Sequence, residues 1–476
     1  MWKFVQAKWI VIVAASCMQA TISTAMSLVL GFCLLACSTV FSARRVRALY
    51  AACGMLSLMP TKVIAMSVLL AYHLSGMGGI ILAHSILNGA FVFFVLYRAY
   101  AHIDYHLLWV AVQLGASWKG IYCVIPFSLL KHTMYATGVL IFILCFSSYS
   151  IPFLLAHNWY EHTLDIVASQ LYQSGHTGLA GGYMVLRACI LMPLWWFCEY
   201  HTNVSSFMQN LSHRPFQVPR VAYQSSAQKG IIVVLGMGCV ILIFYPILYL
   251  IWYAQGNQVA NIWYRFFCES SFLIGTISFW WATFNTVASA FLSSMLALFF
   301  GALLSYVYNK ENSFLYVSMT AIGSSSLLVG SLWCEIIFSS GQHYTWCGPL
   351  FRMVICQFLL NIPFICRLIT SRLQDYQQEW SYVSQSYGAS SCQQWCLVML
   401  PFVRPALYQG WGICFGLSLT ESTAFSVMVQ QGWITLPIAS KLLYQNGDHM
   451  QALALILLLM AASFVVHGCY IYRRHV

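Results

Sequence analysis

Eleven apolar stretches alternate with short polar segments along this chain, and most of them are about 20 residues or longer. They cover residues 9–41, 50–73, 77–98, 134–156, 177–199, 230–254, 273–307, 314–339, 348–370, 405–430 and 450–472. A helix of about 20 apolar residues crosses a bilayer. Charged residues make up 7% of the chain, against about 25% in soluble domains. The sequence therefore predicts an all-α polytopic membrane protein.

The basic residues predict the orientation of these spans. Fifteen of the 22 Lys and Arg fall on one side of the predicted spans and only four on the other. Cytoplasmic loops carry the excess of Lys and Arg, so the basic side is predicted to be cytoplasmic and the N-terminus external. The net charge of +11 is then a consequence of topology, and no nucleic-acid partner is predicted. Most cysteines lie inside apolar runs without a CxxC pair, so no metal site is predicted either.

The chain contains two pairs of similar segments, and the members of each pair are separated by nearly the same number of residues. The first pair is the loops "QLGASWKGIYCVIP" (113–126) and "SYGASSCQQWCLVMLP" (386–401), and we call the sequence spacing from Gly115 to Gly388 the repeat offset. Downstream, "TLDIVASQLYQSG" (163–175) and "TLPIASKLLYQNG" (435–447) are identical at seven of thirteen positions, at a spacing one position shorter. The chain is therefore predicted to contain two parallel copies of one membrane module, residues 1–199 and 230–476, joined by a polar cytoplasmic linker, 200–229.

Each repeated loop has the residues of a short docking element. A glycine ends a helix or allows a sharp turn, and a later proline, Pro126 or Pro401, starts or breaks the next element. Two such segments on the cytoplasmic side suit a symmetric pair of partner subunits. The alternative is a pair of ordinary linkers left by gene duplication.

The second loop resembles a known signature, the cytoplasmic loop of permease subunits in binding-protein-dependent ABC importers. That signature is Glu-Ala-Ala, three residues, Gly, nine residues, then Ile-x-Leu-Pro. Here Gly388 is followed by nine residues and by "VMLP", whereas the Glu-Ala-Ala positions read "YVS" (382–384). The first loop keeps the glycine and an Ile-Pro pair at a shorter spacing. The resemblance implies that ATPase-coupling loops contain Gly115, Ala116, Ser117, Ile125, Pro126, Gly388, Ala389, Ser390, Leu400 and Pro401.

Over nearly its whole length the chain is similar to the fused two-module permeases of thiamine and ferric-iron importers, and segments 140–155 and 435–460 favour the thiamine type. The resemblance implies two tandem type I modules with twelve spans, so the first module would lack its first helix. It also implies a multi-pass protein of the bacterial cytoplasmic (inner) membrane. Its partners would be two copies of a separate ABC ATPase and a periplasmic or secreted substrate-binding protein. The sequence has no Gly-x-x-x-x-Gly-Lys-Ser/Thr motif, so ATP would bind to the partners and this chain would hold no cofactor and not be an enzyme.

The predicted function is inward movement of thiamine, or a related cationic solute, by alternating access. A ferric-iron permease is the alternative, and a secondary transporter or a membrane enzyme would be a different class. Acids inside a membrane are costly and often functional. Glu421 lies within the predicted span after the second loop, and its counterpart in the first module is near Phe146. It is the candidate substrate-path residue, with pairing inside the bundle as the alternative. Glu335, Lys62 and Arg187 receive no role.

Overall fold

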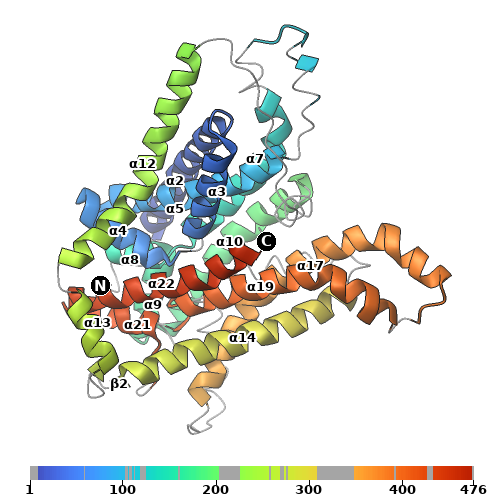
Figure 1. The fold of residues 1–476 in the computed structure, drawn as a ribbon. Helices are drawn as coiled ribbons and strands as arrows, with labels where there is room; N and C mark the ends of the chain where they lie inside the picture. The colour runs from blue at the N-terminus through green and yellow to red at the C-terminus, as the bar shows by residue number, and fades with distance from the viewer. Residues whose placement is uncertain are drawn as a thin grey trace. The chain divides into compact units, whose positions relative to one another are not determined.

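The computed structural model is almost entirely helical (Figure 1). It describes residues 9–57, 59–101, 106, 110–111, 113–117, 125–158, 161–202, 226–256, 259–268, 273–274, 277–307, 348–390, 393–425 and 433–473. The only strands in these ranges are β1 (Leu273–Ile274) and β2 (Ile277–Ser278), a two-residue antiparallel pair. The prediction of an all-α membrane protein is therefore confirmed. The predicted linker lies mostly outside the described residues, and so does the predicted span 314–339 with Glu335.

Contacts divide the chain into two compact units, of which the first comprises Met1–Val167 and Pro193–Tyr253. Within this unit α5 packs against α2, α3 and α7. α12 also belongs to it, since the Tyr72 hydroxyl donates a 3.3 Å hydrogen bond to the carbonyl oxygen of Leu242. The helices of the unit are α2 (Trp9–Ser38), α3 (Ala43–Ser57), α4 (Thr61–Tyr72), α5 (Gly76–Ala101), α7 (Ile125–Phe146), α8 (Ser150–Leu155) and most of α12 (Ser226–Gly256).

The second unit comprises Ala168–Met192 and Ala254–Val476. Here α14, α17 and α19 pack against one another, and α22 packs against α21, α19 and α13. Two helices, α9 (Leu164–Gln173) and α10 (Thr177–Thr202), contain residues of both units. The other helices are α13 (Val259–Cys268), α14 (Phe279–Val307), α17 (Gly348–Ser386), the π-helical segment η3 (Gln394–Met399), α19 (Leu400–Thr420), α21 (Leu436–Gln445) and α22 (His449–Arg473). The module boundaries predicted from the sequence stay a prediction.

Several helices are long and apolar enough to cross a bilayer, as expected of a multi-pass membrane protein. Within the described part of the chain there are six of them: Trp9–Ser38, Gly76–Ala101, Thr177–Leu194, Gly230–Gly256, Phe279–Ser305 and His449–Val466. Large apolar side chains such as Val234, Leu248 and Phe299 are exposed on these helices. Because lipid tails are as apolar as these side chains, their exposure toward lipid needs no covering protein.

Three predicted spans have different boundaries in the structure. The stretch 50–73 is not one continuous helix, because α3 and α4 meet at an angle of 105°. Pro60, directly before α4, lacks the N–H that a continuous helix would need. The stretch 134–156 ends as a helix at Phe146, and the stretch 405–430 ends at Thr420. The residues that follow both helix ends are still largely apolar, so hydropathy could not show where these helices end.

Glycines allow close helix contacts at equivalent places in the two units. A Cβ atom added at Gly31 would overlap the Val92 side chain, and one added at Gly301 would overlap the side chain of Ile365. Val92 and Ile365 are separated by the repeat offset, and the two glycines by a spacing three positions shorter. Small residues let backbones of membrane helices approach each other closely. α2 and α5 therefore pack in the first unit as α14 and α17 do in the second.

Candidate functional site

The downstream repeat forms identical elements in both copies. α9 and α21 are each ten residues long. The spacing between their first residues is one position shorter than the repeat offset, and so is the spacing between their last residues. The following helices, α10 and α22, start at Thr177 and His449, which have the same spacing. The internal repeat read from the sequence thus has the same secondary structure in both copies.

Four glycines of the repeated segments adopt a left-handed backbone. Gly115 and Gly388 both have φ of 77°, and the downstream pair Gly175 and Gly447 have φ of 82° and 89°. Such angles are strained for residues with a Cβ atom, whereas glycine adopts them readily. In all four places the residue after the glycine donates its N–H to the carbonyl five positions earlier: Ala116 to Ala111, His176 to Leu171, Ala389 to Ser384 and Asp448 to Leu443. This is the Schellman helix ending.

The segment after Gly388 begins a helix with its own cap. The Ser390 backbone N–H and hydroxyl donate to the Gln393 side-chain oxygen, each over 3.0 Å, and the Gln393 N–H lies 3.4 Å from the Ser390 hydroxyl. This reciprocal pair is a capping box. The helical segment then continues through η3 into α19, where Leu400 and Pro401 occupy the first two positions. The expected short helix is therefore not separate but the first turns of a longer helical segment.

The first loop is described only at its ends. Ala116 and Ser117 follow the glycine turn, and Ile125 and Pro126 form the first residues of α7. Residues 118–124 lie outside the described ranges. The two loops therefore share their glycine turn, and Pro126 and Pro401 each occupy the second position of the helix that follows, α7 or α19.

Large apolar side chains are exposed around both glycine turns. Leu114 is 82% exposed in the first loop, and Tyr387 is 87% exposed in the second. Tyr382 and Leu397, on either side of Gly388, are also exposed. Side chains with this exposure are accessible to a partner protein. These loops therefore have the chemistry that docking onto a partner would use.

Glu421 does not lie inside a spanning helix, which corrects the sequence-based placement. It is the residue directly after α19, and its Oε1 accepts hydrogen bonds from the N–H groups of Thr423 (2.6 Å) and Ala424 (3.1 Å). The Glu421 N–H lies 3.4 Å from the Ser418 carbonyl oxygen. In the first unit the Ser148 N–H lies 3.3 Å from the Cys145 carbonyl oxygen in the same way. The backbone counterpart of Glu421 is therefore Ser148, two residues after Phe146.

Several basic residues inside the predicted spans are buried. Lys62 is on α4 and Arg187 on α10, and Arg98 on α5 lies over the rings of Tyr50 and Phe94. The Arg98 Nε also donates a hydrogen bond to the Tyr50 hydroxyl. Cation–π contacts of this kind stabilise a desolvated arginine. Arg98 therefore connects α5 to α3 within the first unit.

Sequence reasoning missed the role of Glu161 in the loop before α9. Its Oε2 accepts hydrogen bonds from the N–H groups of His157 (2.8 Å) and Asn158 (3.1 Å). Burial works to raise the pKa of this carboxyl, but these donors and the Met77 N–H outweigh it and lower the pKa below its usual value. Gly76, at the start of α5, has φ of 68° and leaves room for the carboxylate. Glu161 thus joins the loop to the N-terminus of α5, where a negative charge is favourable.

We expect Glu161→Gln to lower the free energy of unfolding at pH 7 by about 1–3 kcal/mol, because a charged acceptor of backbone N–H groups is lost. Since the folded pKa is depressed, this stabilisation is present above the ordinary carboxyl pKa and is lost as the pH falls through the folded value. Thermal unfolding in detergent at pH 7 and near the folded pKa measures it. A difference between wild type and variant that does not shrink at low pH would contradict this role.

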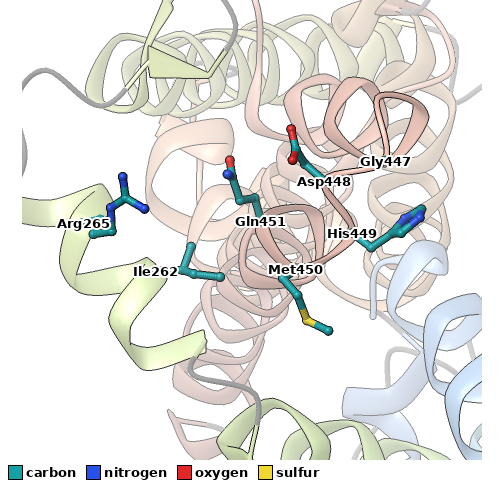
Figure 2. A pocket seen from close by; sticks show the side chains of 7 residues that line it. All are labelled: Ile262, Arg265, Gly447, Asp448, His449, Met450 and Gln451. Atoms are coloured by element: carbon teal, nitrogen blue, oxygen red, sulfur yellow. The ribbon is translucent and has the colours of Figure 1, made fainter.

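A pocket lies at the end of the second unit away from the Gly388 loop (Figures 1 and 2). It has a volume of about 410 Å³ and is lined by Ile262, Arg265, Gly447, Asp448, His449, Met450 and Gln451. Arg265 comes from α13, whereas His449 is the first residue of α22 and Asp448 directly precedes it (Figure 2). The Trp263 indole N–H donates a 2.9 Å hydrogen bond to the Ala454 carbonyl oxygen and holds α13 on α22. The pocket thus combines charged and apolar side chains, and it lies at the end predicted to face outward.

No protein family model matches the sequence. The thiamine transport system permease protein of Haemophilus influenzae is 20% identical over 416 residues, covering 84% of this chain and 73% of that protein. The sulfate transport system permease protein of Escherichia coli is 25% identical over 202 residues, covering 38% of this chain and 71% of its own length. A Salmonella typhimurium protein named as a 2-aminoethylphosphonate transport system permease is 26% identical over 194 residues, covering 39% and 72%. The chain is thus a multi-pass membrane protein that is similar to permease subunits of ABC importers, and over most of its length to a thiamine-type permease.

Proposed function

We propose that this chain is the permease subunit of an ABC importer and supplies both membrane modules from one polypeptide. The observation that carries the proposal is the pair of glycine turns at Gly115 and Gly388. They have the same φ and the same hydrogen-bond pattern, each precedes a helix that begins with a repeated proline, and both carry exposed apolar side chains. Two equivalent docking elements suit two copies of one ATPase subunit.

The transport cycle follows from this arrangement. A substrate-binding protein delivers the solute on the outer side of the bacterial cytoplasmic membrane, and two ATPase subunits bind ATP on the inner side. Each ATPase holds one loop, so ATPase closure moves the helices that begin at the loops, α7 and α19. The modules then alternate between outward-open and inward-open states. The chain itself performs no ATP hydrolysis.

The substrate proposed is thiamine or a related cationic solute. Support comes from the thiamine-system relative, which matches most of this chain, whereas the sulfate and aminoethylphosphonate relatives match about two fifths. The ferric-iron alternative would keep the same mechanism with another cationic substrate. Glu421 is the proposed acid on the substrate path.

Reconstitution tests the function. The chain is purified with a candidate ABC ATPase and a candidate substrate-binding protein, placed in liposomes and supplied with labelled thiamine. We expect uptake that requires internal ATP and both partners, and that stops when the ATPase lacks its phosphate-binding lysine. Uptake driven by an ion gradient without the ATPase would instead identify a secondary transporter. ATP-driven uptake of ferric iron but not thiamine would change the substrate alone.

A further inference from the structure

A buried asparagine is bonded to the end of the helix that follows the first loop. The Asn88 Nδ2 on α5 donates a 3.2 Å hydrogen bond to the Cys145 Sγ, and the Gln19 Nε2 on α2 donates a 2.7 Å bond to the Cys145 carbonyl oxygen. Cys145 is the second-last residue of α7. All three side chains are buried. Two helices are thus bonded to the last turn of a third.

The second unit contains the same arrangement. The Asn361 Nδ2 on α17 donates a 2.8 Å hydrogen bond to the Ser418 hydroxyl, and the Gln357 Nε2 donates a 2.9 Å bond to the Ser418 carbonyl oxygen. Ser418 is in the last turn of α19. The Ser293 hydroxyl on α14 lies 3.0 Å from the Gln357 Oε1, so three helices meet here as well.

The two arrangements are equivalent by position. Asn88 and Asn361 are separated by the repeat offset that separates the loop glycines, and so are Cys145 and Ser418. The side-chain acceptor is a thiol in the first unit and a hydroxyl in the second. The bonded glutamine lies on α2 in the first unit and on α17 in the second. The asparagine is the same in both. Sequence reasoning missed the pair, although its spacing was the available signal.

The bonded atoms lie where a helix ends inside an apolar stretch. The last carbonyl groups of a helix have no partner within that helix, and in a bilayer they must find one within the protein. In each unit a glutamine amide bonds such a carbonyl, while the asparagine bonds the side chain beside it. Interhelical hydrogen bonds in membranes contribute little stability on average. Stability alone therefore does not account for the presence of this arrangement in both copies.

The first unit also has polar atoms that this conformation leaves unused. Gln19 Oε1, Ser23 Oγ and His84 Nε2 are buried and make no hydrogen bond within the described part of the chain. His84 is the counterpart of Gln357, because the repeat offset separates them. Ser23 is the counterpart of Ser293, because they have the spacing that separates Gly31 from Gly301. In the second unit these counterparts are bonded to each other. Groups that are unpaired in one state can gain partners in another, which suits helices that shift against one another.

We propose that Asn88 and Asn361 are matched positioning residues for transport. Each holds the far end of the helix that starts at a loop, α7 or α19, against its neighbour, α5 or α17. Movement of the loop then moves the helix as one body instead of bending its free end. The inference rests on the proposed function, because it needs loops that an ATPase moves.

Asn88→Leu and Asn361→Leu in the reconstituted transporter test the proposal. We expect ATP hydrolysis to stay near that of the wild type, while the amount of solute transported per ATP falls about two- to thirtyfold, the range of mutational coupling effects. Cys145→Ser and Ser418→Cys exchange the acceptors between the copies and should keep wild-type transport per ATP. Ser418→Ala, which alters only the acceptor, should lower the ratio if Asn361→Leu does not fold.

A matched control separates coupling from stability. Asn285 is also buried, and its Nδ2 donates a 3.3 Å hydrogen bond to the carbonyl oxygen of Ile434, a residue outside α19. Asn285→Leu should lower thermal stability without changing transport per ATP. Wild-type transport per ATP in both asparagine variants and in Ser418→Ala would overturn the positioning role alone. Absence of ATP-driven uptake in the wild type would overturn the proposed function and this inference with it.

Discussion

Gly388→Val is expected to separate ATP hydrolysis from uptake while the protein remains in the membrane. Gly388 has φ of 77°, and a Cβ atom there would meet nothing within 4 Å. The substitution therefore acts through backbone strain of about 1–3 kcal/mol and not through a clash. Relief of that strain turns the capped helix start at Ser390 away from its docking position. A free-energy change of this size corresponds to about 5- to 150-fold in a coupled equilibrium.

The measurement is uptake per ATP hydrolysed in liposomes that contain the ATPase and the binding protein. Gly447→Val is the control, because Gly447 has φ of 89° and open space, at the opposite end of the second unit. It carries the same strain away from the docking loop and should keep the wild-type ratio. Normal uptake in Gly388→Val would remove the docking role of this loop. An equal loss in both variants would assign the effect to strain alone.

The repeat could be predicted in detail because it involves residues with special backbone requirements. A glycine that must adopt a positive φ cannot be replaced freely, so both glycine pairs remain visible in the sequence. Seven identities in thirteen positions revealed the repeat, and the two segments form helices of equal length, α9 and α21. Span number was less accessible, since hydropathy alone does not distinguish one span from the bent pair α3 and α4.

The ends of helices were the least predictable part of the site. Residues after Thr420 stay apolar enough to extend a span, and only the hydrogen bonds of Ser418 and Glu421 show where α19 ends. Asn88 and Asn361 were missed for a related reason. Single polar residues in apolar helices are recognised by their partners, and those partners come from helices distant in sequence. Tertiary contacts decide both features.

Glu421→Gln is expected to lower thiamine uptake by about tenfold or more, a loss of about 1.4 kcal/mol. Thiamine carries a permanent positive charge, and moving a cation through a medium of low dielectric constant is costly without an opposite charge. The carboxylate is half-buried at the end of the helix that begins at the Gly388 loop. Glutamine keeps the oxygen that accepts from Thr423 and Ala424, so the variant removes the charge but leaves an acceptor for these bonds.

Two further variants distinguish a substrate role from a structural one. Ser148→Ala alters the backbone counterpart in the first unit, which carries no charge, and should leave uptake unchanged. Glu421→Ala removes the acceptor of two N–H groups as well as the charge, so it should lower the amount of folded protein. If Glu421→Gln also reduced folded protein, and the remaining molecules transported thiamine at the wild-type rate, the carboxylate would belong to the turn after α19. Reduced uptake with normal folding and normal basal ATP hydrolysis would instead place the charge on the substrate path, because no structural loss would then account for the lower rate.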